Sequence, residues 1–573
     1  MRPVSRRRVL RQTSTISLGL LAAGLARAAG QVKEKFDVCI YGGTSGGVIA
    51  AATLARQGRS VLLIEPTRHV GGMTAGGLGW VDCGKAQTIG GLTRQLFGDI
   101  ANYYHGLKVP TNGWSVEPHV AEMFFEKLLD DPLITVLREA RLSALKISGR
   151  RIESITLDKA LVQQHGAPAS IPLEERFYVA TAPIYLDCSY EGDLMARAGV
   201  RCRVGREGEK EYNENLAGFR INSLSAGSIK AGRSDDARLR IDPYVRMGDS
   251  SSGLISFVSE PAIVPVGSKQ DTVQAYTFRL CLSKENCKPI DPPSNYEADD
   301  YEIVRRYIDA LKAVGAPLWR GDLYYNFGLE KRYGSSLPRL LKITRLMRGK
   351  TDVNNSGPVS IDYVNGGATR YVCGDWRTRA KIWRNHEDYI RGFLYFLRTD
   401  ERLPDWLRNE ISLWGLAQDE FKDTNGWPHQ LYVREARRMQ SRVVVHQSYC
   451  ERGGDPQMSI GKGSYALDSH QCQRLLQDGL VVGEGGFFQG VKPYCIPYGA
   501  VCPAESDCEN LLVTCCLSST HVAYASLRME PVFMILSESA AVAADMALVE
   551  GCAVQQVPLD QLRKQLTERG QVI

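Results

Sequence analysis

The stretch from Asp37 to Gly47, DVCIYGGTSGG, constrains the fold of this chain most, because it joins a short apolar run directly to a glycine-rich turn. The small residues that follow are typical of the start of a helix, and a second apolar run at residues 61–64 ends in the acid Glu65. A strand, a glycine turn, a helix and a second strand with a terminal acid form the local unit that binds dinucleotides. The sequence therefore predicts an α/β protein built around such a unit.

The composition of the turn has a physical reason. Glycines let the backbone approach a pyrophosphate, whose negative charge then lies at the N-terminus of the helix that begins near Gly46. Glu65 can accept hydrogen bonds from the adenosine ribose hydroxyls, and its charge repels a 2′-phosphate, so the unit favours FAD or NAD over NADP. The expected cofactor-binding residues of the turn are Gly42, Gly43, Thr44, Ser45, Gly46 and Gly47.

Thr44 departs from the usual G-x-G-x-x-G pattern, because it stands where the second glycine is expected. Its β-branched side chain either loosens the approach of the backbone to the phosphates or offers them a hydroxyl donor. The alternative for the whole segment is a glycine turn in an ordinary strand–helix unit without a ligand. The position of Glu65, directly after the second strand, favours the dinucleotide site.

The first 28 residues have the features of a twin-arginine export signal. The basic run SRRRVLR at residues 5–11 precedes an apolar stretch at residues 16–25 and the small-x-small cleavage site that ends in Ala28. The apolar stretch is shorter than the roughly 20 residues that a membrane span needs. We therefore expect cleavage near Ala28, a periplasmic or secreted mature protein, and no stable membrane span.

Charge and cysteine content narrow the function further. The leader holds six arginines and no acid, so the formal net charge of +6 belongs to it and does not indicate binding to nucleic acid or anionic membranes. An oxidising compartment permits disulfides among the 15 cysteines, and either Cys281–Cys287 or Cys502–Cys508 could close a loop. No C-x-x-C pair occurs, so zinc and iron–sulfur sites are not expected.

A chain of 573 residues is too long for one compact core, so two or three domains are expected. Residues 31–205 are predicted to form the first part of the nucleotide-binding domain and residues 471–573 its second part. Residues 206–470, with more Trp, Tyr, Arg and Pro and no glycine fingerprint, are predicted to form a substrate or cap domain. The predicted fold is thus a Rossmann-like FAD/NAD(P)-binding domain, with a ββα-type sheet and a β-meander, interrupted by an α+β substrate domain.

Hydrophobic periodicity predicts the individual elements. Helices are expected at residues 92–104, 119–129, 194–198, 384–398 and 531–549. Meander strands are expected at residues 134–137, 151–157 and 176–180, and buried strands at residues 182–188 and 510–516, with a loop at 517–521.

Several of these blocks together resemble the FAD-dependent oxidoreductases of the glutathione-reductase-2 structural type. The sequence is most similar to a bacterial family of such proteins, some of whose members carry the label xanthan lyase. The main blocks are residues 38–47 with Glu65, 69–77 with Gly90 and Gly91, 185–193, and 511–544. The likeness also touches residues 431–438 and 464–470, and so spans nearly the whole mature chain.

The resemblance implies FAD as the cofactor and a role for each block. Gly71, Gly72 and Met73 would lie against the phosphates and the ribityl–isoalloxazine side, and the strand around Leu142 would offer backbone groups to adenine. Asp193 matches the residue that follows the second strand motif of the family. The helix that begins near Pro531 would direct its N-terminus at the flavin N1–C2=O edge, where reduction adds negative charge.

Three residues are the candidates for catalysis. His521 precedes the helix that would touch the flavin, and a histidine there could take a proton from a substrate; alternatively, it satisfies backbone groups in a loop. Arg528 could hold a substrate anion or the charge of the reduced flavin. Arg434 would share a helix face with Arg438 and could bind a carboxylate or a sugar acid, although pairing with Glu435 is an equal alternative.

Two further sites are open to either interpretation. The pair Asp468 and His470 could serve acid–base chemistry or cap a turn, and the turn is slightly favoured. His69 raises the idea of a covalent flavin link, which nothing in the sequence requires and which is not expected.

The function predicted from these residues is an exported FAD-dependent dehydrogenase or oxidase. It would move hydride from a small polar substrate to flavin and pass electrons to an unidentified acceptor, because no second dinucleotide fingerprint for NAD(P)H appears. Two alternatives stay open: a redox-neutral flavin-containing lyase that acts on a sugar or polysaccharide, and a protein that binds FAD or NAD without turnover.

Overall fold

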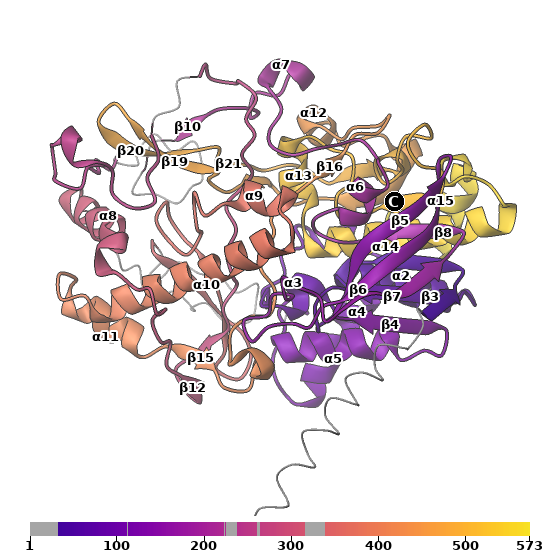
Figure 1. Ribbon diagram of the computed structural model, residues 1–573, viewed down its shortest axis with the longest axis horizontal. Helices are drawn as coiled ribbons and strands as arrows, with labels where there is room; N and C mark the ends of the chain where they lie inside the picture. Colours follow the sequence, from indigo (N-terminus) through magenta and orange to yellow (C-terminus); the bar gives the residue numbers. More distant parts are fainter. Residues whose placement is uncertain (1–31, 112, 223, 225–237, 261–263, 316–338) are drawn as a thin grey trace, which may run out of the picture.

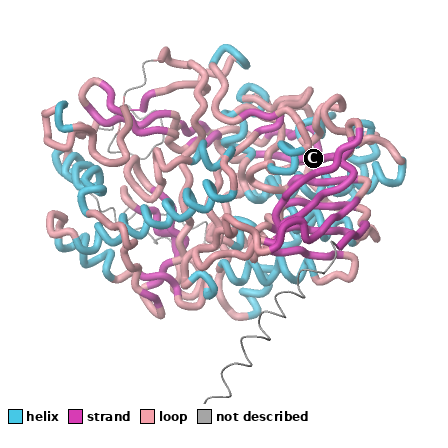
Figure 2. Tube along the Cα trace, viewed as in Figure 1, coloured by secondary structure: helices cyan, strands magenta, loops and turns pink. Residues whose placement is uncertain are grey.

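A computed structural model describes residues 32–111, 113–222, 224, 238–260, 264–315 and 339–573 of the chain. The predicted export signal lies outside these residues. Figure 2 shows that the long strands gather on one side of the molecule, whereas the middle of the chain forms mainly helices and loops with short strands.

The central element of the fold is a five-stranded parallel sheet. Its strand order is β23 (Leu511–Val513), β8 (Ile184–Asp187), β2 (Val38–Tyr41), β3 (Val61–Glu65) and β4 (Ile134–Arg138). All residues of β2 and β3 are buried, as expected for parallel strands that are covered on both faces. Because β23 pairs with β8, the sheet contains segments from both ends of the chain, and Figure 1 shows the yellow C-terminal helices beside the indigo strands.

Alternating side chains of the sheet enter two separate cores. Val38 and Ile40 of β2 pack with helices α2 (Ser45–Ala55) and α14 (Glu530–Glu550), whereas Cys39 and Tyr41 pack with the second sheet. The helices approach closely, because a Cβ atom at Gly46 would lie 2.5 Å from the Ser537 hydroxyl oxygen. The same face carries α3 (Gly72–Ala75), α4 (Gly91–Gly106) and α5 (Pro118–Leu129).

The second sheet contains two of the three predicted meander strands, together with two strands that hydrophobic periodicity did not predict. Its order is β1 (Val32–Lys35), β7 (Glu174–Thr181), β6 (Arg151–Lys159) and β5 (Ala140–Ser148). The prediction that residues 134–137 belong to the meander is wrong, since β4 pairs with β3 of the parallel sheet. Glu139, with φ of 55°, turns the chain out of β4 and into β5, and local periodicity does not reveal such a change of sheet.

The middle of the chain is built around one long helix. The predicted helix at residues 384–398 is confirmed within α10 (Trp376–Thr399), which starts earlier because the Asp375 carboxylate accepts a hydrogen bond from the Thr378 amide. The other helices here are α8 (Glu302–Ala313), α9 (Ala368–Cys373) and α11 (Asp405–Ser412). The strands are β11 (Leu282–Ser283), β12 (Cys287–Lys288), β13 (Leu341–Arg345), β14 (Thr351–Asn355) and β15 (Gly415–Ala417).

The remaining strands form short antiparallel pairings. They are β9 (Cys202–Arg203) with β16 (Arg438–Met439), β17 (Ser459–Gly463) with β22 (Tyr494–Pro497), β18 (Leu467–Ser469) with β21 (Phe487–Gln489), and β20 (Leu480–Glu484) with both β10 (Ile221–Asn222) and β19 (Gln473–Gln477). The remaining helices are α6 (Asp193–Arg197), α7 (Glu209–Tyr212), α12 (Gln447–Glu451), α13 (His521–Leu527) and α15 (Leu559–Glu568).

Two predictions about local structure are wrong. His521 is the first residue of α13 and not part of a loop, because the Thr520 hydroxyl caps the helix by accepting the Ala523 amide. Arg434 and Arg438 do not share a helix face, since residues 431–437 are irregular and Arg438 begins β16.

All 15 cysteines are free, so neither of the loop-closing disulfides considered above forms. Of the described helices, only α14 is long and apolar enough to cross a membrane, and 83% of its apolar window is buried inside the protein. Its apolar surface is therefore explained by the core that it shares with α2.

Candidate functional site

The glycine turn between β2 and α2 is packed so closely that side chains are excluded at two positions. Gly42 has φ of +102°, and a Cβ atom there would lie 2.6 Å from the Ser189 amide nitrogen. A Cβ atom at Gly47 would lie 1.9 Å from the Gly42 carbonyl oxygen. The turn therefore needs glycine at both positions, and it presents backbone at the start of α2, whose first N–H groups have no intrahelical acceptor.

Thr44 is the N-cap of α2. Its hydroxyl oxygen accepts a hydrogen bond from the Gly47 amide at 3.3 Å and donates its own proton to the Cys188 carbonyl at 2.8 Å. The hydroxyl therefore makes one hydrogen bond to the start of the helix and one to the segment after β8. Helix capping explains why a threonine stands at this position of the glycine pattern, and no contact to phosphate is needed.

Glu65 closes the other side of the turn. One carboxylate oxygen accepts the Gly43 amide at 2.8 Å and the other accepts the Thr67 amide at 2.7 Å. Burial raises the pKa of Glu65, and the hydrogen bonds from Thr67 and Gly43 oppose this rise. Each carboxylate oxygen has a further lone pair, so Glu65 can still accept ribose hydroxyls as the sequence predicts.

The buried carboxylate of Glu530, the first residue of α14, joins the predicted cofactor segments. It accepts the Ser45 hydroxyl at 2.5 Å, the Thr74 hydroxyl at 3.2 Å and the Tyr190 hydroxyl at 2.7 Å. Tyr190 in turn accepts the Met73 amide at 2.9 Å. One acid therefore holds the glycine turn, the segment around Met73 and the turn after β8 at the N-terminus of α14.

Sequence reasoning missed Glu530 and Tyr190. Burial raises the pKa of Glu530, and hydrogen bonds from Ser45, Tyr190 and Thr74 oppose this rise. The only local signal was an acid directly before Pro531 at the start of a long apolar helix, a position that the helix dipole favours for a carboxylate.

Gly71 and Gly72 lie beside the glycine turn. Both have positive φ, and a Cβ atom at Gly71 would lie 2.3 Å from the Phe125 ring. A Cβ atom at Gly72 would lie 2.2 Å from the Tyr190 hydroxyl and 3.2 Å from the Thr44 Cα. The structure thus brings together the turn, the Gly71–Gly72 pair and the start of α14.

Two predicted cofactor residues have other partners in the structure. The Leu142 amide donates to the Tyr41 hydroxyl at 3.3 Å, so this N–H is not free for adenine. The two carboxylate oxygens of Asp193 accept hydrogen bonds from Arg379 at 2.5 and 2.8 Å, and one of them also accepts a hydrogen bond from Arg437 at 2.9 Å. These ion pairs fasten α6 to the middle of the chain, so Asp193 acts as a structural anchor.

A second polar centre surrounds the three candidate catalytic residues. His521 is 1% exposed; its Nδ1 lies 2.7 Å from Glu435 and its Nε2 lies 3.3 Å from the Ser469 hydroxyl. Burial alone raises the pKa of Glu435, but His521 and Arg438 outweigh it and lower that pKa to about 2. Both ring nitrogens of His521 are therefore engaged in a buried network.

Arg434 belongs to a second ion-paired group. Its Nη2 contacts one oxygen of Asp362 at 2.8 Å, and the other oxygen contacts Nδ1 of His470 at 2.6 Å. Burial and the nearby Arg434 lower the pKa of His470, despite the opposing effect of Asp362. The His470 side chain is 13% exposed, and its contact with Asp362 is made by Nδ1.

Arg528 lies close to Arg434, with Tyr432 between them. Arg528 donates to the Tyr432 hydroxyl at 3.1 Å and to the Asp468 carbonyl at 2.8 Å. The Arg434 guanidinium lies over the Tyr432 ring, 4.8 Å from its centre. In the described part of the chain, the buried Nε atoms of Arg434 and Arg528 lack partners, which is costly unless an anion or another acceptor binds there.

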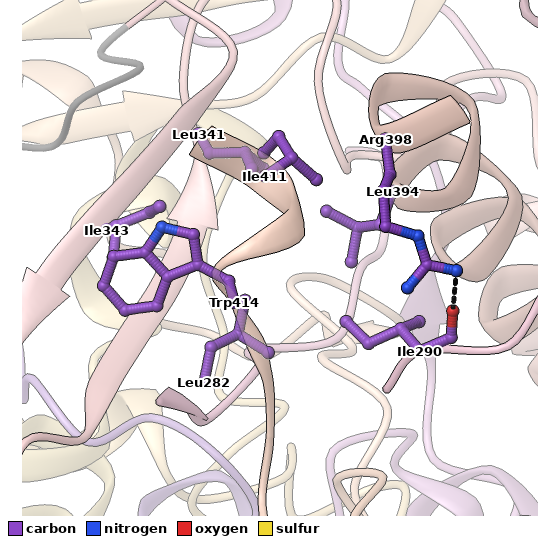
Figure 3. A pocket seen from close by; sticks show the side chains of 8 residues that line it. All are labelled: Leu282, Ile290, Leu341, Ile343, Leu394, Arg398, Ile411 and Trp414. Carbon is purple, nitrogen blue, oxygen red and sulfur yellow. Dashed lines mark hydrogen bonds between the residues drawn. The ribbon is translucent and has the colours of Figure 1, made fainter. Parts of the chain in front are cut away.

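A hollow in the middle of the chain has a different character. An apolar void of about 10 Å³ is lined by side chains from β11, β13, α10 and α11, together with Trp414 and Ile290. Figure 3 shows that Arg398, the one arginine of the lining, directs its guanidinium to the backbone carbonyl of Ile290. Its lining is almost wholly apolar and its volume is far below that of a ligand pocket, so it is a packing defect and not a candidate site.

Comparison with known proteins identifies one family. The profile described as FAD dependent oxidoreductase matches residues 37–566. A search of curated proteins finds no match.

Three solved structures are similar to part of this chain. L-proline dehydrogenase from P. horikoshii is 14% identical over 31% of this chain and 26% of its own, with a TM-score of 0.17. THI4 from Thermovibrio ammonificans is 18% identical over 34% of this chain and 73% of its own, with a TM-score of 0.21. Thioredoxin reductase from T. acidophilum is 15% identical over 27% of this chain and 34% of its own, with a TM-score of 0.16.

Proposed function

Because the chain belongs to the family of FAD-dependent oxidoreductases, we propose that it is an exported dehydrogenase or oxidase that moves hydride from a small anionic substrate to flavin. The export rests on the leader sequence, and the substrate class rests on the arginines of the second polar centre. The two parts of the proposal are tested separately.

FAD is the cofactor of the protein, and the first site fits it. The close-packed glycine turn would face the diphosphate, Glu65 would hold the ribose, and the start of α14 would face the flavin edge that gains charge. When bound, FAD supplies the acceptor for two electrons from the substrate.

The observation that carries the proposed chemistry is the pair His470 and Asp362. When Nδ1 of His470 donates its proton to Asp362, Nε2 becomes an acceptor that can take a proton from a substrate hydroxyl or amine. The lowered pKa of His470 keeps the ring neutral near pH 7, as a general base requires. His521, the base predicted from sequence, lies deeper and has both nitrogens engaged, so we assign it to positioning.

Arg434 and Arg528 are proposed to bind the negative group of the substrate. Both guanidinium groups are buried and both approach Tyr432. Within the described part of the chain, neither Nε proton has an acceptor. A carboxylate would satisfy such donors with charge-assisted hydrogen bonds. Hydroxy acids, sugar acids and amino acids have the required carboxylate next to an oxidisable carbon.

Turnover with an artificial electron acceptor tests this proposal. Wild-type protein is assayed with a panel of hydroxy, sugar and amino acids, each beside its neutral amide or alcohol analogue. We expect activity with one class of acid and at least tenfold lower kcat/KM with its neutral analogue, and a further loss in Arg528→Gln. Equal rates with the acid and its analogue would contradict the anion site. Product formed without any acceptor would favour the lyase alternative.

A further inference from the structure

Four polar side chains from distant segments meet away from both polar centres described above. His69 follows β3, Glu122 lies on α5, Asp423 lies in the short helix η5 (Lys422–Thr424), and His429 follows it. Nδ1 of His69 lies 2.6 Å from Glu122, and Nε2 of His69 lies 2.8 Å from Asp423. Ligand atoms of His69, Glu122 and His429 all lie within 4.8 Å of one another.

His429 is the unusual member of this group. It is 4% exposed, yet neither of its ring nitrogens has a hydrogen-bond partner among the residues that the structure describes. Its ring stacks on His69 with centres 3.8 Å apart and an angle of 7° between the planes, and Phe421 packs edge-on at 5.2 Å. A buried imidazole with two unsatisfied nitrogens is costly, so its side chain is expected to serve a ligand.

We propose that His69, Glu122 and His429 form a binding site for a divalent metal ion of the zinc type. Imidazole nitrogens and carboxylate oxygens are common zinc ligands, and three protein ligands with a water molecule complete a tetrahedral coordination. Asp423 lies at the other ring nitrogen of His69 and is not counted among the ligands. The two rings are parallel, so their lone pairs do not converge. Metal binding therefore requires the His69 ring to turn out of the stack.

A second cluster of the same residue types provides the contrast. Glu117, His119 and Glu420 also lie close together, but the ammonium of Lys350 sits among them. Its nitrogen lies 2.8 Å from Glu117, 2.7 Å from Asp419 and 2.6 Å from Glu420. A cation already occupies this cluster, so it is not expected to bind a metal.

The proposed site would connect two regions of the fold. His69 and Glu122 belong to the nucleotide-binding region, whereas His429 comes from the middle of the chain. His69 lies two residues before Gly71, so a bound ion would also hold the segment that faces the cofactor. The lack of C-x-x-C pairs in the sequence does not exclude this site, because its ligands are histidines and an acid that are far apart in sequence.

Zinc titration of the full mature flavoprotein tests the proposal. After treatment with EDTA and dialysis, calorimetry with Zn²⁺ alone and elemental analysis measure the bound metal. We expect one zinc ion per chain and a higher Tm with Zn²⁺. His429→Phe keeps an aromatic ring against His69 but offers no ligand, and it should bind zinc at least tenfold more weakly and lose the Tm shift.

Two further variants make the result decisive. Glu122→Gln, at a partly exposed position, should weaken zinc binding as well, while His119→Ala in the Lys350 cluster should bind zinc like the wild type. Flavin absorbance reports that each variant is folded. The proposal is overturned if the wild type binds no stoichiometric zinc, or if His429→Phe and Glu122→Gln bind it as tightly as the wild type.

Discussion

The hydroxyl of Ser45 donates a 2.5 Å hydrogen bond to the carboxylate of Glu530, across 485 residues of sequence. This contact fastens the start of α2 to the start of α14, so both helix N-termini open toward the same place. Two helix N-termini favour negative charge, one at the diphosphate and one at the flavin edge. The relationship explains why the cofactor domain needs both ends of the chain.

Replacing Glu530 by Gln should loosen this junction. The amide would turn an N–H group toward hydroxyl donors that now have an acceptor, and hydrogen bonds to charged groups contribute about 1.5–3 kcal/mol each. We expect the free energy of unfolding to fall by about 2 kcal/mol and the ratio of flavin to protein to drop. Absorbance and urea denaturation measure both. Glu550→Gln, at the exposed far end of α14, is the control and should change neither.

Thr44 tests whether capping or phosphate binding explains the altered glycine pattern. Thr44→Val removes the hydroxyl at nearly constant shape and should lower the free energy of unfolding of the apoprotein by about 1 kcal/mol, because the cap of α2 is lost. Thr44→Ser should restore it. If Thr44→Val weakened FAD binding while leaving apoprotein stability unchanged, the hydroxyl would be a phosphate ligand and the capping account would be wrong.

The proposed base predicts a pH dependence. Protonated His470 cannot accept a proton, so kcat/KM should fall as the pH drops through the lowered pKa of His470, below the ordinary value for histidine. His470→Asn can keep the contact to Asp362 but has no Nε2. It should lose roughly 10²- to 10⁴-fold in kcat with unchanged flavin content.

His521 provides the comparison for that experiment. As a positioning residue in a buried network, His521→Asn should lower stability and leave the acid limb of the pH profile in place. The assignment fails if His521→Asn removes the acid limb while His470→Asn retains it.

A buried histidine also predicts how stability depends on pH. Burial lowers the pKa of His386 to about 4, so the folded protein resists a proton that the unfolded chain accepts below pH 6.5. Stability should therefore fall as the pH drops from 6.5 toward 4, by up to about 3 kcal/mol from this group. His386→Phe should flatten that part of the profile in urea denaturation, and an unchanged profile would contradict the assignment.

The export proposal has its own test. N-terminal sequencing of the protein from the periplasm should show a start near residue 29, and replacing Arg6 and Arg7 by Lys should leave the protein in the cytoplasm. Cytoplasmic protein that retains Met1 in the unaltered chain would contradict export.

Local sequence predicted the parts of the fold whose causes are local. The apolar runs of β2, β3, β8 and β23 and the glycine turn need no distant partner to be recognised. The membership of β4 in the parallel sheet was not predictable, because a single residue, Glu139, changes the direction of the chain. The start of α13 does have a local signal, since Thr520 is a typical N-cap residue.

The candidate site was predictable only where it is made of backbone. The glycines and Glu65 follow a spacing rule, whereas Asp362 and His470 are 108 residues apart and meet through the fold. The four-residue spacing of Arg434 and Arg438 predicts that they share one helix face. In the structure each has its own buried carboxylates, which no helical spacing could indicate.

Anaerobic titration of the purified flavoprotein with the best acid substrate tests the central claim most directly. If substrate oxidation delivers two electrons to the flavin, one equivalent of substrate should bleach the flavin absorbance fully, and admitting an electron acceptor should restore it. Product that accumulates while the flavin stays oxidised in the absence of any acceptor would contradict the account.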